Sequence, residues 1–408
     1  MLRRFIARRA LSLSPPPRLL SSLTPPPGSA TATLHADALA GKFSTDMDVA
    51  PPLSLSTTFT TSDGGHVYSR ISSPTRDRAE RLLSAVESTS DTTAHAVLYA
   101  SGLAATFGAL ARLLPKRVAI SGGYHGTHLV LSQLSRISAG AHCTPMPLPP
   151  PSSVASTLRP GDLLWLETPR NPDCELADIA AYVEAARSVG NVKVVVDGTF
   201  APPPLQYPLS LGADMVMHAT TKGLCGHSDA VGGAVCVSDE GLAHELRSDR
   251  TALGSTPGSL EVWLLQRSLR TLHLRVKQQS ESAAALAEWL HRAVVNEAGH
   301  PLAGRIASVR HPSLPSDPSH AVAKKQMADG LYGGCFAMEL TTEGAARALP
   351  QALTYFRDAT SLGGVESLIE WRRKYDDAIS PTLLRVSVGL EDVEELKRDL
   401  QEAVLSVS

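Results

Sequence analysis

Two residues with complementary chemistry follow apolar runs near the middle of the sequence. Asp197 ends the run VKVVVD, and Lys222 comes after the run DMVMHAT among small and hydroxyl-bearing residues. Because ligands of open α/β sheets bind beyond the carboxyl ends of the strands, we expect both side chains to face one crevice. A partly desolvated lysine amine condenses with an aldehyde cofactor, and a carboxylate keeps the cofactor's ring nitrogen protonated, so that the ring accepts electrons. Taken singly, most such residues are better explained otherwise, Asp197 as a turn cap and Lys222 as a solvated lysine.

The stretch between about residues 94 and 237 alternates short apolar runs with segments of helical pattern. The runs lack the polar alternation of a half-exposed strand, so they predict strands buried on both faces, as in a mostly parallel sheet covered by helices. They are AHAVLYASG, RVAISGG, LLWLETP, VKVVVDG, DMVMHAT and GGAVCV. We therefore expect an α/β fold with Asp197 and Lys222 at one edge of its sheet.

Four segments are expected along the chain. Residues 1–34 are a predicted targeting leader, and residues 35–80 are a turn-rich N-terminal arm that leads into a helix. Residues 81–270 form the expected large domain. Residues 271–408 form a smaller C-terminal α+β domain, with strands in GGCFAMELT and LLRVSVGL and a terminal amphipathic helix.

The leader differs in composition from everything after it. It is rich in serine, and the first acidic residue of the chain is Asp37. Its arginines, which lie among Leu, Ile, Phe and Ala, are Arg3, Arg4, Arg8, Arg9 and Arg18. An Arg-rich, Ser-rich and acid-free segment is typical of a mitochondrial targeting peptide. The alternative is an extension with no address, which would leave the protein in the cytoplasm.

The composition argues against several classes of partner. The 38 Lys and Arg residues nearly balance the 40 Asp and Glu residues, so no global field attracts nucleic acid or an anionic membrane. No apolar run is long enough to span a bilayer. The five cysteines never form C-x-x-C, and His125 and His128 lack an acid or thiol at ligand spacing, so neither a disulfide framework nor a metal site is expected. A small-molecule substrate is the expected partner.

The segments VDGTFAPPPLQYPLSLGAD and HATTKGLCGHSDAVGG resemble the cofactor-lysine region of the Cys/Met-metabolism enzymes that depend on pyridoxal 5'-phosphate (PLP), the cystathionine γ-synthase and γ-lyase family. The resemblance extends over nearly the whole chain after the leader, in six further blocks that occur in the family's order. These are YSRISSPTR, YASGLAA, GGYHGTH, WLETPRNP, SLGGVESL and LLRVSVGLED. It implies the fold of type I PLP-dependent transferases, with the large and small domains given above.

The resemblance assigns roles around the cofactor. Lys222 would hold PLP covalently and then move protons between substrate carbons. Asp197 would pair with the ring nitrogen, and Tyr124 would stack on the ring as a catalytic and cofactor-binding residue. Asn171 would lie near the phenolic oxygen of the cofactor.

The same resemblance implies how the phosphate is bound. The backbone N–H groups of Gly102 and Leu103 would point at it from a helix N-terminus, and Thr221 would add a hydroxyl. Tyr68 and Arg70 resemble the pair that reaches the phosphate in a neighbouring subunit. Each active site would then need two chains, and the family resemblance implies a homotetramer built from two such dimers.

On the substrate side, Arg385 resembles the arginine that clamps the α-carboxylate through a bidentate fork. Ser361 would position both Lys222 and the substrate carboxylate, and Glu167 would support the wall that carries Asn171 as a substrate-binding residue. Without the resemblance, Arg385 would read as an edge-strand arginine and Ser361 as a turn residue.

The sequence also departs from the family pattern. Ala219 and Ser73 replace a common phosphate-binding serine and a common asparagine. Thr360, immediately before SLGG, is neither the acid frequent in γ-synthases and γ-lyases nor the aromatic residue of β-lyases. After ESL, the block IEWRRKYDD replaces a histidine-containing one. Fine specificity therefore does not transfer from the family to this chain.

The function that the sequence predicts is γ-replacement on an activated homoserine with a thiol, as in cystathionine γ-synthases. Cystathionine or methionine γ-lyase activity, which gives a 2-oxo acid and ammonia, is the alternative, because the balance depends on water access and pocket geometry. A non-catalytic scaffold of the same fold is a third reading. A hydrolase with a G-x-S-x-G elbow and a P-loop nucleotide enzyme are excluded by their missing motifs.

Overall fold

A computed structural model of the chain describes residues 28–37, 50–60, 65–328 and 330–407. The larger domain is built on a 7-stranded sheet with the strand order β1-β7-β6-β5-β4-β2-β3. In that order the strands are β1 (His95–Tyr99), β7 (Gly233–Val237), β6 (Met215–His218), β5 (Lys193–Asp197), β4 (Leu163–Glu167), β2 (Arg117–Ile120) and β3 (Thr144–Pro147). Only β7 runs antiparallel to its neighbours, so the predicted, mostly parallel α/β sheet is confirmed.

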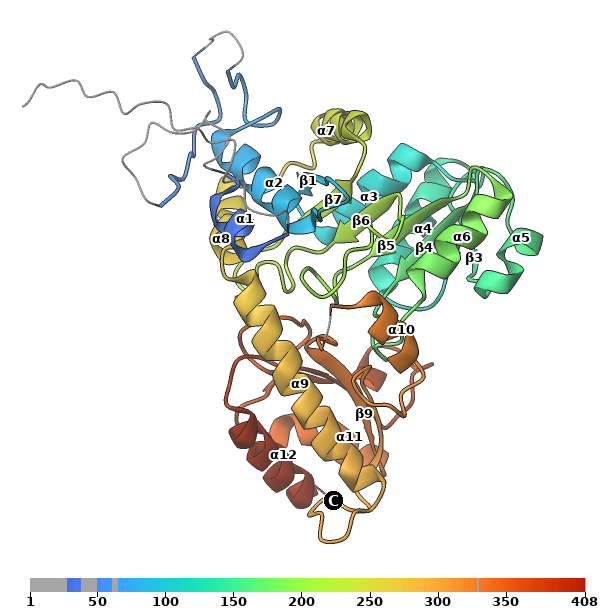
Figure 1. Cartoon of the computed structure of the whole chain (residues 1–408), viewed down its shortest axis with the longest axis vertical. Coiled ribbons are helices and arrows are strands. Elements are labelled where there is room, and N and C mark those ends of the chain that lie inside the picture. The colour runs from blue at the N-terminus through green and yellow to red at the C-terminus, as the bar shows by residue number, and fades with distance from the viewer. Residues whose placement is uncertain (1–27, 38–49, 61–64, 329, 408) are drawn as a thin grey trace, which may run out of the picture.

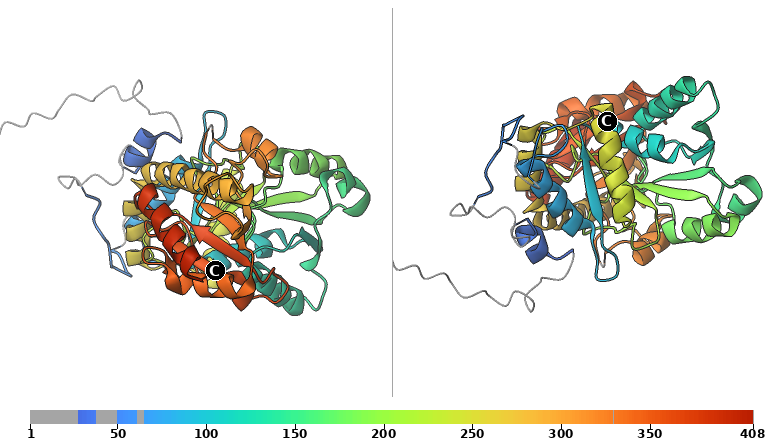
Figure 2. Two further views of the ribbon diagram at one scale, coloured as in Figure 1. Left: turned by 90° about the horizontal axis from the view of Figure 1, so that it is seen from below. Right: turned by 90° about the horizontal axis from the view of Figure 1, so that it is seen from above.

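Helices cover both faces of this sheet (Figure 2). They are α2 (Pro74–Glu87), α3 (Gly102–Leu113), α4 (His125–Ile137), α5 (Val154–Thr157), α6 (Ile179–Val189), α7 (Glu240–Leu253) and α8 (Ser259–Leu269), with a short 3-10 turn, η2 (Pro151–Ser153). Within β4, Trp165 packs with residues of α3, α4 and α7, whereas Leu164 and Leu166 pack with residues of α5 and α6. Successive residues of a strand point to opposite faces of the sheet, and helices cover both faces, so both sets of side chains are buried. This explains the unalternated apolar runs of the sequence.

The smaller domain has a 5-stranded sheet with the order β10-β11-β12-β9-β8. The strands are β10 (Arg357–Asp358), β11 (Leu368–Trp371), β12 (Leu383–Ser387), β9 (Cys335–Leu340) and β8 (Ile306–Arg310). The pairing of β11, β12, β9 and β8 is antiparallel, and β10 adds a short parallel edge. The helices α9 (Leu272–Val294), α11 (Glu343–Ala352) and α12 (Val393–Val407) contribute to one apolar core with these strands, and the 3-10 turn η3 (Arg372–Lys374) follows β11.

Two segments tie the domains together. The long helix α9 begins in the core of the larger domain, where Leu272 and Val276 are buried, and runs into the smaller domain (Figure 1). The helix α10 (His320–Gln326) returns to the larger domain, where the backbone N–H of Ile179 donates to the side-chain oxygen of Gln326 at 2.9 Å. The smaller domain is therefore joined to the larger one through both α9 and α10.

The first described residues pack on the larger domain. Helix α1 (Ala30–His35) lies beside α2, and the backbone N–H of Gly28 donates to the carbonyl of Ala85 at 3.0 Å. Asp37 accepts hydrogen bonds from Gln266 and Arg270. The last part of the predicted leader thus lies in a packed segment, whereas residues 1–27 of the leader and residues 38–49 and 61–64 of the arm lie outside the described residues.

A membrane-spanning helix is not found in the described part of the chain, since none of its helices is both long and apolar enough. All five cysteines are free and buried. Within the same described residues, no three His, Cys, Asp or Glu side chains gather as a metal site would require.

Candidate active site

A cavity of about 580 Å³ lies between the two domains. Its floor is formed at the carboxyl ends of β4, β5 and β6, and its other wall comes from β11, β12 and the segment before them. The structure brings together ten of the twelve predicted site residues there, namely Lys222, Asp197, Tyr124, Gly102, Leu103, Thr221, Asn171, Ser361, Glu167 and Arg385. The sequence-based expectation that Asp197 and Lys222 face one crevice is therefore met.

Lys222 follows β6 and points across the cavity to the smaller domain. Its Nζ donates to the Oγ of Ser361 at 2.9 Å. Burial, with a further contribution from the positive charge of Arg385, lowers the pKa of the lysine below its ordinary value. Ser361 itself has a backbone φ of 128°, a conformation that non-glycine residues rarely adopt and that is found where surrounding contacts enforce it. The lysine is thus shifted toward its neutral, nucleophilic form and held by a fixed acceptor.

Asp197 ends β5 on the floor of the cavity and is almost fully buried. One carboxylate oxygen accepts the backbone N–H of Thr199 at 3.0 Å. Burial raises the pKa of Asp197, although the hydrogen bonds from Thr199 oppose this effect. A buried carboxylate of this kind is stabilised by a cationic partner, which is the role that a protonated ring nitrogen fills.

Glu167 ends the neighbouring strand, β4, in register with Asp197. Its two carboxylate oxygens accept the backbone N–H groups of Tyr124 at 2.7 Å and Asn171 at 2.8 Å. Burial, together with the negative charge of Asp197, raises the pKa of Glu167 to about 8. In this structure Glu167 supports the wall by fixing two loops, and its direct contact with substrate stays a prediction.

Tyr124 precedes α4 and keeps 40% of its surface exposed, although it lines the cavity. Its ring has a tilted contact with His125, with the ring centroids 4.8 Å apart. An added Cβ at Gly126 would lie 2.5 Å from the Tyr124 ring, so a glycine is required behind it. The loop therefore presents an aromatic ring with free surface to a ligand.

Helix α3 begins at the same cavity. Ser101 caps it by accepting the N–H of Ala104, while the N–H groups of Gly102 and Leu103 donate to no other group in the described part of the chain. Two free N–H groups at the start of a helix of this length attract an anion such as a phosphate. The hydroxyl of Thr221 faces the same cavity but is bonded to the backbone of Gly232.

These features fit PLP, since the larger domain offers a group for each part of that cofactor. A nucleophilic amine, a buried carboxylate, a partly exposed aromatic ring and two free backbone donors surround one cavity. Lys222, Asp197, Tyr124 and the start of α3 would hold its aldehyde carbon, ring nitrogen, ring face and phosphate, respectively.

Arg385 projects from β12 in the opposite wall and is almost fully buried. Its Nη1 donates to the Oδ1 of Asn171 at 2.8 Å, and its Nη2 donates to the carbonyl oxygen of Ser361 at 3.0 Å. A guanidinium fixed in this way is suited to bind a carboxylate. The contacts of Arg385 with Asn171 and Ser361 were not predicted from the sequence.

Sequence reasoning missed several residues of the cavity. Thr199 holds both Asp197 and, through its hydroxyl, the backbone N–H of Ala219. Glu370 and Arg372, in and directly after β11, also line the cavity together with Tyr375. The signal that could have found the last three was the block IEWRRKYDD, because it departs from the family directly after a recognisable motif.

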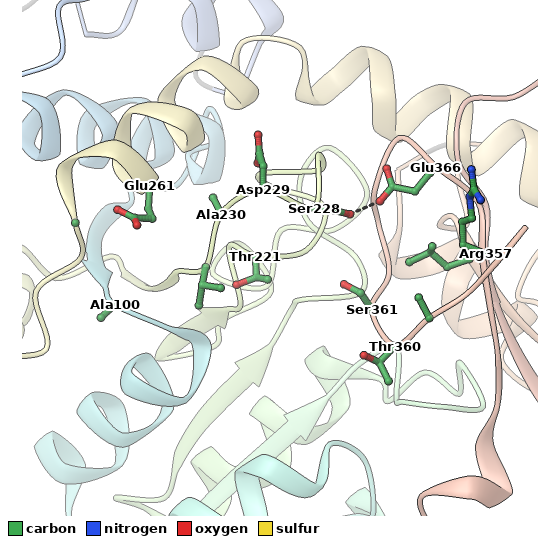
Figure 3. Close-up of a pocket in the computed structure, with 14 residues that line it drawn as sticks. Ala100, Thr221, Ser228, Asp229, Ala230, Glu261, Arg357, Thr360, Ser361 and Glu366 are labelled. Carbon is green, nitrogen blue, oxygen red and sulfur yellow. Dashed lines mark hydrogen bonds between the residues drawn. The ribbon is translucent and has the colours of Figure 1, made fainter.

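Tyr68 and Arg70 do not line this cavity in a single chain. Both are exposed, and the Arg70 guanidinium lies 5.4 Å from the centroid of the Tyr68 ring. A second, more open cavity of about 870 Å³ adjoins the first (Figure 3), and the two share Thr221, Val231, Thr360 and Ser361. Its walls also carry several charged side chains, namely Asp229, Glu261, Arg357 and Glu366.

Comparison with known proteins agrees with this geometry. The family described as Cys/Met metabolism PLP-dependent enzyme matches residues 30–405. Cystathionine γ-synthase of Mycobacterium tuberculosis is 38% identical over 354 residues, which cover 84% of this chain and 87% of the relative. The crystal structure of metB from Corynebacterium glutamicum superposes with a TM-score of 0.82 at 30% identity and covers 93% of this chain and 98% of that one. The structure of apo CalE6, a methionine γ-lyase from Micromonospora echinospora, gives 0.81 at 34% identity, with coverage of 92% and 98%.

Proposed function

This chain belongs to the Cys/Met metabolism PLP-dependent enzyme family, and we propose that it catalyses γ-replacement on an activated homoserine. A bond forms between Cγ and the sulfur of a thiol such as cysteine. The bond between Cγ and the oxygen of the leaving group breaks, and the leaving group departs with the bonding electron pair and takes up the proton of the thiol. The observation that carries the proposal is the contact of Lys222 with Ser361, in a cavity where Arg385 is fixed 3.0 Å from the same serine's carbonyl.

The residues divide the work between them. When bound, PLP supplies the electron sink that stabilises negative charge at the substrate's α-carbon. Arg385 binds the α-carboxylate and so orients the amino acid. The Nζ of Lys222, whose pKa is lowered by burial, takes the α-proton and carries protons between Cα and Cβ. Ser361 keeps that amine on the substrate side of the cavity.

The γ-lyase reaction is the second candidate. It uses the same Lys222 and Arg385 but ends in a 2-oxo acid and ammonia when water, rather than a thiol, completes the reaction. The similarity to a structure named as a methionine γ-lyase supports it, as does the open cavity beside Thr360. Because Thr360 is not an acid, water access to the cavity decides between γ-replacement and γ-elimination.

The test is a direct product assay on the purified protein reconstituted with PLP. With O-succinylhomoserine and cysteine, we expect cystathionine to form faster than 2-oxobutyrate, and Lys222→Ala to abolish both products. A faster release of 2-oxobutyrate would establish the γ-lyase reading instead. A protein that stays colourless with added PLP and forms neither product would favour a non-catalytic scaffold.

We propose further that two copies of the chain share each active site in a homo-oligomer, a dimer of dimers. The exposed position of Tyr68 and Arg70, outside their own chain's cavity, supports this. The test mixes two inactive variants, Lys222→Ala and Arg70→Ala, after gentle unfolding and refolding together. Activity should return in the mixture, because one of the two sites in a mixed dimer has both intact residues. No recovery in mixtures that contain mixed dimers would count against the shared site.

We also propose that the leader directs the protein to mitochondria. Its arginine and serine content and the lack of acidic residues before Asp37 support this proposal. Because α1 packs on α2, the targeting information is expected before residue 28. A fusion of residues 1–27 to a fluorescent protein should reach mitochondria, and a cytoplasmic signal would overturn the proposal.

A further inference from the structure

One carboxylate is shared by two arginines in the substrate-side wall. The Oε2 of Glu370 forms an ion pair with the Nη2 of Arg385 at 2.7 Å and accepts a hydrogen bond from the Nη1 of Arg372 at 2.5 Å. The side chains of Glu370, Arg385 and Arg372 are only 3%, 5% and 12% exposed. We call these three residues the charge triad.

The triad arises from the pairing of two strands. Glu370 in β11 lies opposite Arg385 in β12, and Arg372 begins the turn η3 directly after β11. All three line the cavity that holds Lys222. The contact between Glu370 and Arg385 therefore lies where the substrate's α-carboxylate is expected.

Glu370 competes with a substrate carboxylate for Arg385. The Arg385 Nη2 donates to the carbonyl of Ser361 and lies in an ion pair with Glu370, whose charge offsets that of the guanidinium. Glu370 and Arg385 alone would form a neutral pair, and a neutral pair attracts an anion weakly. With Arg372 the triad keeps one net positive charge, which is available to the substrate.

Two atoms of the triad lack partners. The Oε1 of Glu370 and the Nε of Arg372 are buried and accept or donate no hydrogen bond within the described residues. One is an acceptor and the other a donor on side chains that already touch. A rotation of the Glu370 carboxylate toward Arg372 would pair these two atoms in a bidentate fork and would weaken the ion pair between Glu370 and the Arg385 Nη2.

We propose that Glu370 and Arg372 are positioning residues for Arg385 that together control how tightly the site binds an amino acid's α-carboxylate. Glu370 holds the Arg385 guanidinium while no substrate is present. When a substrate carboxylate arrives, Glu370 transfers to Arg372, which accepts it without leaving a buried charge unpaired. This inference rests on the proposed amino-acid chemistry of the site, but it concerns binding and does not depend on γ-replacement.

The experiment measures the dissociation constant of L-norvaline, an amino acid without a γ-leaving group, from the change it causes in the visible absorbance of the PLP-loaded protein. Arg372→Gln should raise that constant about 10- to 100-fold, because two unit charges a few ångströms apart interact strongly in a partly buried site. Arg372→Lys, which keeps the charge, should raise it less. Arg373→Gln is the matched control, since Arg373 is absent from the cavity lining and lies beside the exposed Asp377.

The decisive variant removes both charges. Glu370→Gln in the Arg372→Gln background leaves the Arg385 charge uncompensated, so the dissociation constant should return to within about 3-fold of the wild-type value. The kcat for any turned-over substrate should change less than KM in Arg372→Gln. A double variant that binds no better than Arg372→Gln, or a control that weakens binding equally, would overturn the proposal. A wild-type protein that binds L-norvaline but forms no cystathionine or 2-oxobutyrate would refute the proposed function and still leave this test intact.

Discussion

The two walls of the active-site cavity are built by different rules. On the larger domain, Lys222, Asp197 and the start of α3 lie just after strands or at a helix start, where ligands of open α/β sheets bind. On the smaller domain, Arg385 and Glu370 meet only because β11 and β12 pair in one antiparallel register. Each cofactor-side group can therefore be located from its own strand end or helix start, whereas the contact within the substrate-side wall depends on the register between two strands.

This difference shows where the chain can diverge. The cofactor side must match one fixed molecule, and its residues keep the family's pattern around Lys222 except at Ala219. The substrate side carries the block IEWRRKYDD, which places Glu370 and Arg372 in the cavity. Substitutions in the two walls should consequently affect different quantities, namely cofactor chemistry on one side and substrate affinity on the other.

The largest expected effect is that of Lys222→Ala on the cofactor side. The kcat should fall by about 10³-fold or more, because the variant loses both the nucleophilic amine and the group that moves protons. Product assays and the visible spectrum of the PLP-loaded protein measure this. Lys193→Ala serves as the control, since Lys193 is an exposed lysine paired with Asp214. Comparable activity in the two variants would contradict the assignment.

Asp197→Asn should give the next largest effect. The amide keeps the shape and the acceptor for Thr199 but removes the charge that would hold a ring nitrogen protonated. We expect kcat to fall about 10²- to 10³-fold, the range seen for loss of one electrostatic group at a reaction centre, with little change in KM. Asp214→Asn, near the other end of β5, is the matched control. An unchanged kcat in Asp197→Asn would show that the cofactor lies elsewhere.

The sequence predicts the cofactor side better than the substrate side. Apolar runs located six strands of the larger sheet, but not β3, whose sequence TPMP has two prolines and lies at the sheet edge, where proline is tolerated. The apolar pattern also could not predict that β7 runs antiparallel, because it reports only burial and not strand direction. Glu370 and Arg372 were missed because their meeting with Arg385 depends on strand register, which a single sequence without turn signals does not fix.

Arg385→Lys tests the substrate side. Lysine keeps the charge but cannot bind Asn171, Ser361 and a carboxylate with one planar fork. Loss of hydrogen bonds to a charged group costs about 1.5–3 kcal/mol, so KM should rise roughly 10- to 100-fold while the visible spectrum without substrate stays unchanged. A changed spectrum with an unchanged KM would show that Arg385 acts on the cofactor and not on the substrate.

The smallest expected effect concerns Glu167, which accepts hydrogen bonds from the loops that carry Tyr124 and Asn171. Burial and Asp197 raise its pKa to about 8, so the folded protein retains a proton that the unfolded chain releases at lower pH. Its stabilising contribution is therefore complete below the ordinary glutamate range and is lost as pH rises toward about 8, with a slope of at most about 1.4 kcal/mol per pH unit. Denaturant unfolding of the cofactor-free protein at several pH values should show this decline in the free energy of unfolding. Glu167→Gln should make the decline shallower. Glu288→Gln is the control and should leave the decline unchanged, because Glu288 is exposed on α9. If the stability of Glu167→Gln fell equally steeply with pH, the titration would belong to another group. Asp197→Asn would be the next variant to test.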